Sequence, residues 1–491
     1  MTAPQLTKRA VGAAWWSALE ISARYGVQFI LIIIIARLLT PADFGLIAML
    51  LVFTSVAALL VDSGFGTALI QRQRTSADDE TTVFIFTIGT SILVAAVLWI
   101  AAPAIANFYA QPPLVALTRI MVIVLPLGAL AAVPDALLTQ RLNFKARAKA
   151  EIIASLCSGV IAVVLAWRGF GVWSLAWQGI ILIGVRALLL WLYSGWRPRG
   201  RFSTASFLNL FGFGSFMLMS SLLDTITIRL QSLLIGRLFN SATLGYYTLA
   251  QNTQQAPTSF MGSLLNRVGL PVFSTVADQP IKLLGALRFS LRAAMFLFVP
   301  CMLGIAIIAK PLMGLLYGVR WETAAPILSI LAVSASLWPL HALNLAALSA
   351  QGKSNLFFRL ELIKKFITIS LILLSSPFGP MAIAGSVLIS SLFGVVINTW
   401  YSKKFLGYGL LAQLSDQRGT FAFSLAAALT GWVILHLNAP GIVPTLAAIG
   451  TAVIVYLSSA LLFRSVALAE LVDLGRSLME SRKSQKASPE S

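Results

Sequence analysis

The sequence predicts an all-α, polytopic membrane protein with fourteen transmembrane helices, and three observations support this fold class. First, 58% of the 491 residues are hydrophobic and 11% are charged, which is too apolar for a soluble protein of this length. Second, the apolar runs are about 18 to 28 residues long, which matches helices that cross a bilayer core of roughly 30 Å. Third, the lysines and arginines behind the net charge of +19 gather in alternate loops, as the positive-inside rule requires.

The chain divides into two predicted lobes of six helices each, two additional helices and a tail. The first lobe, residues 1–200, contains predicted helices at 11–38, 43–70, 81–105, 114–139, 151–167 and 172–195. The second lobe, residues 201–405, contains helices at 206–238, 243–275, 286–310, 324–350, 356–376 and 380–402. Residues 406–465 add helices at 420–437 and 443–463, and residues 466–491 form the tail. The basic loops lie on the side of both termini, so we expect both termini and the tail in the cytoplasm.

An internal repeat relates the two lobes. The segment Ile35–Gly45, IARLLTPADFG, aligns without a gap with Ile235–Gly245, IGRLFNSATLG, and five of the eleven residues are identical. Six helices is an even number, so both copies enter the membrane in the same direction. We therefore expect a pseudo-twofold axis along the membrane normal between the lobes.

Three motifs carry a family resemblance: ARLLTPADFG after the first helix, LVDSGFGTALIQRQ at the end of the second, and QRLNFKARAKAE after the fourth. With these, the chain resembles the polysaccharide transporters of the multidrug/oligosaccharidyl-lipid/polysaccharide (MOP) superfamily, and most of all Wzx-type flippases and colanic-acid exporters. The resemblance covers essentially the whole chain. It implies a location in the bacterial cytoplasmic (inner) membrane, a cationic central cavity and alternating access.

The resemblance also implies a substrate and partners. Such proteins move undecaprenyl-pyrophosphate-linked oligosaccharides from the inner to the outer leaflet for the synthesis of O-antigen, capsule or exopolysaccharide. The expected partners are the lipid-linked oligosaccharide, the bilayer, and the polysaccharide polymerase and glycosyltransferases of the same pathway. Nothing in the sequence indicates a nucleic-acid partner or requires more than a monomer.

Arginines inside predicted helices are the main candidates for substrate binding. They are Arg24, Arg119, Arg186, Arg229 and Arg267. Each costs about 2.5 to 3.5 kcal/mol at the bilayer centre, so they must face water, carboxylates or an anionic substrate. A guanidinium group gives pyrophosphate paired, charge-assisted hydrogen bonds. For Arg119 and Arg186 we favour snorkelling or structural ion pairs, and for Arg267 snorkelling is an equal alternative.

Polar residues at helical spacing extend this candidate cavity. Glu20, Arg24 and Gln28 share one face of the first helix, and Asp224 and Arg229 lie on the seventh. The eighth helix carries a stripe with four-residue spacing, which suits sugar hydroxyls and a phosphate: Gln251, Gln255, Ser259, Ser263 and Arg267. The alternatives are salt bridges of Arg24 and Arg229 with Glu20 or Asp224, and hydrogen bonds between helices for the stripe.

Carboxylates in the helices are candidates for ion coupling: Glu20, Asp62 and Asp224. Asp62 precedes Ser63 and Gly64, so it either binds a coupling ion or caps a broken helix end. The sequence indicates no metal site and no cofactor, since Cys157 and Cys301 lie in separate apolar spans and His341 and His436 are isolated in the sequence.

We expect a transporter and not an enzyme. The chain contains neither a nucleotide-binding loop motif nor a zinc-hydrolase motif, so transport must draw on gradients. One alternative is a cation-coupled multidrug or small-molecule exporter of the same superfamily, although arginines outnumber carboxylates in the predicted cavity. Another is a membrane polysaccharide polymerase or ligase, for which the predicted external loops are short.

Overall fold

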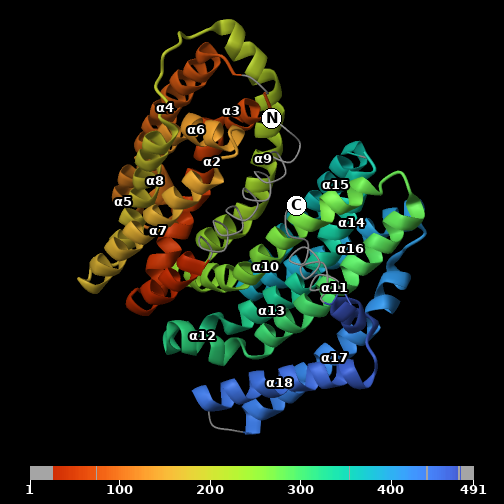
Figure 1. The fold of residues 1–491 in the computed structure, drawn as a ribbon. Helices are drawn as coiled ribbons and strands as arrows, with labels where there is room; N and C mark the ends of the chain where they lie inside the picture. The colour runs from red at the N-terminus through yellow and green to blue at the C-terminus, as the bar shows by residue number, and fades with distance from the viewer. Residues whose placement is uncertain (1–25, 73–74, 353, 438–440, 474–475, 477–491) are drawn as a thin grey trace, which may run out of the picture. The chain divides into compact units, whose positions relative to one another are not determined.

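The structure is a computed structural model that describes residues 26–72, 75–352, 354–437, 441–473 and 476. Every secondary-structure element within these residues is a helix, which confirms the all-α fold class. The chain forms two compact units, Met1–Leu249 and Ala250–Ser491, which we describe separately. Figure 1 gives the helix labels used below.

The first unit begins with an apolar helix, Gly26–Leu38, and continues through eight labelled helices. These are α2 (Pro41–Asp62), α3 (Phe65–Gln71), α4 (Ala77–Tyr109), α5 (Leu114–Met121), α6 (Val124–Gln140), α7 (Phe144–Trp167), α8 (Val172–Ser194) and α9 (Thr204–Leu238). The long helix α10 (Ser241–Thr275) begins in this unit and ends in the second. Buried side chains of α3, α6 and α9, with Trp196, form one of its hydrophobic clusters.

The second unit continues from α10 through ten further elements. They are α11 (Pro280–Ile307), α12 (Ala309–Tyr317), η1 (Val319–Ala324), α13 (Ala325–Ser336), α14 (Trp338–Ala350), α15 (Ser354–Ser375), η2 (Ser376–Phe378), α16 (Pro380–Leu406), α17 (Leu410–Leu437) and α18 (Ile442–Leu462). Apolar residues of α10, α11, α14 and α16, with Tyr408, form one of its hydrophobic clusters. Helices α17 and α18 lie side by side (Figure 1).

Eleven helices of the described residues are long and apolar enough to cross a membrane, so the chain is a multi-pass membrane protein. The predicted count of fourteen stays a prediction. The three remaining predicted spans differ from the others in physical character. Most of the first lies outside the described residues, α10 carries the polar stripe, and α15 contains four charged residues between Arg359 and Lys365.

The two copies of the repeat begin their helices in the same way. At the start of α2, the Thr40 hydroxyl accepts the Asp43 N–H at 3.4 Å, and the Asp43 carboxylate accepts the Thr40 N–H at 2.9 Å. At the start of α10, the Asn240 side chain accepts the Thr243 N–H at 2.7 Å. These caps satisfy backbone donors that a helix end leaves unpaired, so the repeated turn sets where both helices begin.

The same segments meet at two glycines. A Cβ atom on Gly45 would lie 1.7 Å from the backbone oxygen of Ser241, and a Cβ atom on Gly245 would lie 1.8 Å from that of Pro41. The contact is reciprocal, because each glycine of the repeat packs against the first residue of the helix that begins in the other copy. Only a residue without a side chain allows the first turns of α2 and α10 to approach this closely.

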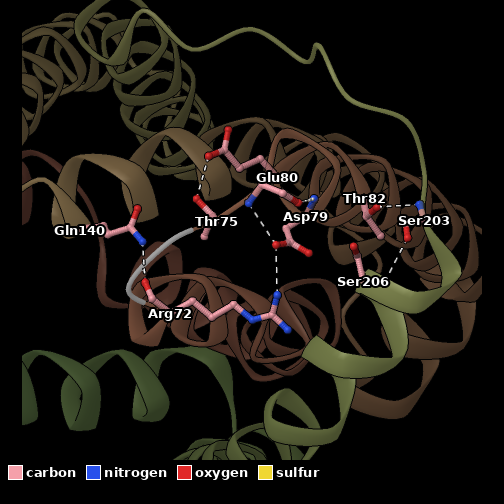
Figure 2. A network of polar contacts seen from close by, with 9 residues as sticks. Arg72, Thr75, Asp79, Glu80, Thr82, Gln140, Ser203 and Ser206 are labelled. Carbon is pink, nitrogen blue, oxygen red and sulfur yellow. Dashed lines mark hydrogen bonds and ion pairs between the residues drawn. The ribbon is translucent and has the colours of Figure 1, made fainter.

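Hydrogen bonds connect the segment between the predicted lobes to the first turns of α4. The Gly200 N–H donates to Thr81 Oγ1 at 3.1 Å, and the Ser203 N–H donates to Thr82 Oγ1 at 2.9 Å (Figure 2). Trp196 Nε1 donates to the Glu80 carboxylate at 2.7 Å. Helix α9, which follows, packs against α2, α3 and α4. The first compact unit therefore includes α9, whereas the repeat divides the sequence near residue 200, and the predicted lobe symmetry stays a prediction.

A second polar network holds the start of α4 in place. The Asp79 carboxylate pairs with Arg72 Nη1 at 3.0 Å and accepts the Ser76 N–H at 3.1 Å (Figure 2). Gln140 Nε2 donates to the backbone oxygen of Arg72 at 2.6 Å. These bonds connect Arg72, which follows α3, to the start of α4 and to the end of α6.

Residues 466–473, at the start of the predicted tail, are helical and packed. Leu468 and Leu471 contact a cluster formed by α11, α17 and α18, and Glu470 pairs with Arg292 Nε at 3.0 Å.

The Tyr408 hydroxyl donates to Asp416 at 2.7 Å, and burial together with this carboxylate raises the pKa of Tyr408. Tyr408 therefore stays a hydrogen-bond donor at neutral pH.

The glycine contact leads to a test of stability. We expect Gly45→Ala to lower the free energy of unfolding by about 1–3 kcal/mol, because the new methyl group has no space beside Ser241. Thermal unfolding of the purified protein measures the change. Gly89→Ala is the matched control, since a Cβ atom there would meet nothing within 4 Å. Equal unfolding temperatures for the two variants would contradict the prediction.

Candidate functional site

The structure describes some of the predicted site residues and not others. Glu20 and Arg24 lie outside the described residues, and so does the side chain of Arg267, although its backbone belongs to α10. Asp224 and Arg229 lie on α9 in the first unit. Gln251, Gln255 and Ser259 lie on α10 in the second unit. The assignment of these residues to one cavity therefore stays a prediction.

Arg229 is half-buried between α9 and α2. Its Nε donates to the Ser55 hydroxyl at 3.1 Å, and that hydroxyl in turn bonds to a backbone oxygen of α2. Arg229 forms no ion pair with a carboxylate of the described residues, so the alternative of a salt bridge with Asp224 is absent from this structure. The bond to Ser55 uses one of the five N–H donors of the guanidinium group. The charge of Arg229 is thus held in place but not neutralised by a described residue.

Arg186 has a different environment. Its Nη2 lies 3.0 Å from Asp135 Oδ2, and its Nε lies 3.0 Å from Glu151 Oε2. Asp135 also pairs with Arg147 Nε at 2.8 Å. This network joins α6, α7 and α8. Arg186 is therefore a structural arginine, in line with the interpretation that the sequence favoured.

Arg119 also has a partner that explains its place in a helix. Its Cζ atom lies 4.4 Å from the centre of the Trp99 ring, within the range of a cation–π interaction. The two residues come from α5 and α4. Like Arg186, Arg119 is accounted for without a substrate.

Asp62 lies at the break between α2 and α3. The chain turns there with positive φ angles of 47° at Ser63 and 75° at Gly64. The Asp62 carboxylate lies beside the first turn of α3, because a Cβ atom on Gly66 would be 3.0 Å from Asp62 Oδ1. It also lines a cavity of about 220 Å³ together with Asp135 and Arg186. Capping of the broken helix end and ion coupling both stay predictions.

Three residues of the α10 stripe make no hydrogen bond to a neighbouring described helix. The side chains of Gln251, Gln255 and Ser259 make no hydrogen bond to another described residue, whereas Ser263 donates to the Phe260 backbone oxygen of the same helix. The contact to a neighbouring helix is made instead by Thr253, whose hydroxyl lies 2.9 Å from the buried Tyr317 hydroxyl. Thr253 is two residues from Gln251 and Gln255, so it points to a different side of the helix. The side chains of Gln251, Gln255 and Ser259 therefore keep their donors and acceptors available among the described residues.

Sequence reasoning missed one polar cluster. His341 is isolated in the sequence, where a packed or interfacial residue is expected rather than a ligand, and its ring bonds to Ser391 and Asn398 of α16 and lies near Lys364 of α15. The sequence did not reveal these partners, because they lie between 23 and 57 positions away in the chain. The signal that was available is the set of polar residues on neighbouring predicted helices: Lys364, Ser391 and Asn398.

Comparisons with known proteins identify the family. Residues 34–326 match the family model described as "Polysaccharide biosynthesis protein". The chain belongs to this family. It is 28% identical to the succinoglycan biosynthesis transport protein ExoT of Rhizobium meliloti (strain 1021) over 476 residues, which covers 94% of each chain. It is 26% identical to the lipopolysaccharide biosynthesis protein WzxC of Escherichia coli (strain K12), with 80% of each chain covered.

A solved structure shows the fold. The lipid II flippase MurJ in an inward closed conformation superimposes with a TM-score of 0.73, 12% sequence identity, and coverage of 93% of this chain and 99% of that chain. These findings confirm the resemblance to the polysaccharide transporters of the MOP superfamily. They also place the chain among multi-pass membrane transporters.

The different environments of Arg186 and Arg229 predict different effects of substitution. Arg186→Gln should lower the unfolding temperature of the purified protein, because Asp135 and Glu151 lose a shared cation. Arg229→Gln should leave that temperature within about 1 °C of the wild type, since Gln keeps a donor for Ser55. Equal losses for both variants would show that Arg229 is a structural residue as well.

Proposed function

We propose that the protein is a flippase that moves undecaprenyl-pyrophosphate-linked oligosaccharide repeat units from the inner to the outer leaflet of the cytoplasmic membrane. The product would serve the synthesis of a surface polysaccharide. The family, the similarity to the transport protein ExoT and the MurJ-like fold support a carrier of this kind. The observation within this chain that carries the proposal is Arg229, a half-buried guanidinium without a described carboxylate partner.

In this proposal, each group of the site has a task. Arg24, Arg229 and Arg267 bind the pyrophosphate, because guanidinium groups offer it several charge-assisted hydrogen bonds. Gln251, Gln255 and Ser259 bind sugar hydroxyls, for which their amides and hydroxyl supply both donors and acceptors. Glu20, Asp62 and Asp224 are the candidates for the return of a coupling ion that resets the empty carrier. The polyprenyl chain stays in the lipid.

The driving force follows from the charge of the headgroup. A membrane potential that is negative inside favours outward movement of an anion by about 2.3 kcal/mol per charge per 100 mV. A pyrophosphate diester with a charge near −2 therefore gains enough to drive export against a considerable gradient. In the proposed alternating access, the chain is a monomer with both termini in the cytoplasm, and the two lobes rock about the turns at Thr40-Pro41 and Asn240-Ser241.

Substitution of the site arginines tests the proposal in cells. We expect Arg24→Ala and Arg229→Gln to abolish surface polysaccharide in a strain that depends on this protein, while the amount of protein in the membrane is unchanged. Arg119→Gln is the matched control, because its guanidinium lies over Trp99. Normal polysaccharide display in the Arg229→Gln strain would remove this residue from the mechanism.

A liposome assay separates the competing functions. Purified protein in liposomes that contain the lipid-linked oligosaccharide should expose the sugar to an enzyme added on the opposite side. A diffusion potential with the sign of the cell membrane should accelerate this exposure. Longer glycans on the lipid would indicate a polymerase, and transport of cationic drugs without any sugar exposure would indicate a multidrug exporter.

A further inference from the structure

A cavity of about 770 Å³ lies in the second unit, where α16 ends and α17 begins. Its lining includes Val396, Trp400, Lys403 and Lys404 of α16 and Leu411 of α17. Both helices are long and apolar enough to cross a membrane. The cavity therefore lies at the ends of two consecutive membrane spans, apart from the residues assigned to the transported substrate.

The length of α16 places this cavity at the level of the lipid headgroups. The helix has 27 residues. A helix of that length extends over about 40 Å, whereas the hydrocarbon core is about 30 Å thick. The last turn, which contains Lys403 and Lys404, therefore reaches beyond the hydrocarbon. Trp400 lies one turn earlier and is of the residue type that is enriched at the boundary between membrane and water.

The cavity wall on α16 changes from apolar to cationic along the helix axis. Val396, Trp400 and Lys404 are spaced four residues apart, so they lie on one face of the helix. The apolar side chains at this cavity are exposed, with accessible fractions of 47% for Val396, 69% for Trp400 and 83% for Leu411. A phospholipid has the same order of groups, because its apolar acyl chains lead to a charged phosphate.

The two lysines have no carboxylate to neutralise them. Neither ammonium group forms an ion pair with a carboxylate of the described residues. Asp416 is the first carboxylate of α17, and it is already paired with two arginines of α11. Lys404 Nζ lies 6.0 Å from the centre of the Phe405 ring, at the outer limit of a cation–π interaction. The N–H donors of both lysines therefore remain available for an anion.

Two glycines in the connecting turn shape the cavity. Gly407 has a positive φ angle of 69°, and its N–H donates to the backbone oxygen of Lys403 at 3.0 Å. The backbone itself thus caps the end of α16, and the lysine side chains are not needed for this purpose. A Cβ atom on Gly409 would lie 3.0 Å from the Cβ and Cδ atoms of Lys403. Glycine at this position therefore allows the stem of Lys403 to lie against the start of α17.

From these observations we propose that the cavity between α16 and α17 binds an anionic phospholipid of the surrounding membrane. The ammonium groups of Lys403 and Lys404 bind the phosphodiester of the lipid through charge-assisted hydrogen bonds. Val396, Trp400 and Leu411 contact the first part of an acyl chain. A free phosphate ion would fill a small part of the cavity and would leave these apolar side chains uncovered.

The bound lipid has a structural consequence. It contacts the end of α16 and the start of α17 together, so it stabilises the junction between the predicted second lobe and the two additional helices. The inference requires only that the chain spans a membrane, and it does not depend on which substrate is transported.

A binding experiment tests the charge of the lipid. Native mass spectrometry of the purified full-length protein in detergent counts bound lipids during titration with phosphatidylglycerol or phosphatidylcholine. We expect the wild type to bind its first phosphatidylglycerol about fivefold more tightly than phosphatidylcholine, because only the former carries a net negative charge. The double substitution Lys403→Gln and Lys404→Gln should remove this preference.

A second double variant is the matched control. Lys282→Gln with Arg359→Gln removes the same amount of charge from exposed side chains that do not line the cavity, so it should keep the preference for phosphatidylglycerol. Equal preferences in the two double variants, or no preference in the wild type, would overturn the proposal.

Thermal unfolding separates a lipid from a free anion. A ligand that binds only the folded protein raises its unfolding temperature, so phosphatidylglycerol should raise that of the wild type by a few degrees and that of the lysine double variant by much less. Trp400→Gln keeps both lysines and loses part of the apolar wall, and it should show less than about half of the wild-type shift. Millimolar inorganic phosphate should produce no such shift. A full shift with phosphate alone, or a full lipid shift in Trp400→Gln, would show a simple anion site and overturn the lipid.

Discussion

The close contact between the first turns of α2 and α10 is the constraint on which the arrangement of the first unit depends. Gly45 and Gly245 each leave room for the backbone of the opposite helix start, and no other residue type fits at these distances. The capped turns at Thr40 and Asn240 fix where α2 and α10 begin, so Gly45 and Gly245 occupy the same position in their helices.

Charged residues inside the helices fall into two groups with different physical roles. Arg186 and Arg119 are satisfied by partners from neighbouring helices, which lowers the cost of placing them in an apolar environment. Arg229 has only the Ser55 hydroxyl among the described residues, so its charge is oriented without being neutralised. An anion-binding carrier requires a guanidinium group like that of Arg229, because a guanidinium that is fully paired with carboxylates has few N–H donors available for a phosphate.

Much of the candidate site was accessible from the sequence, and the reason is the cost of polar groups in a bilayer. The arginines within apolar runs and the polar stripe of α10 were visible as exceptions to the composition around them. What the sequence left open was their partners. The sequence left two interpretations of Asp62, as a cap or as an ion-coupling residue, and both stay predictions. The partners of His341 were hidden from the sequence because they lie on another helix.

The sequence by itself determined that this is a helical membrane protein, where most of its helices lie, and which two segments repeat. Each backbone polar group must be satisfied within its own segment in lipid, so long apolar runs leave the helix as the only local solution. The tertiary structure decided that each repeated glycine packs against the start of the opposite helix, that α9 packs with the first unit, and which buried charges are paired. Those outcomes depend on side-chain contacts between residues far apart in the chain, for which no local pattern carries information.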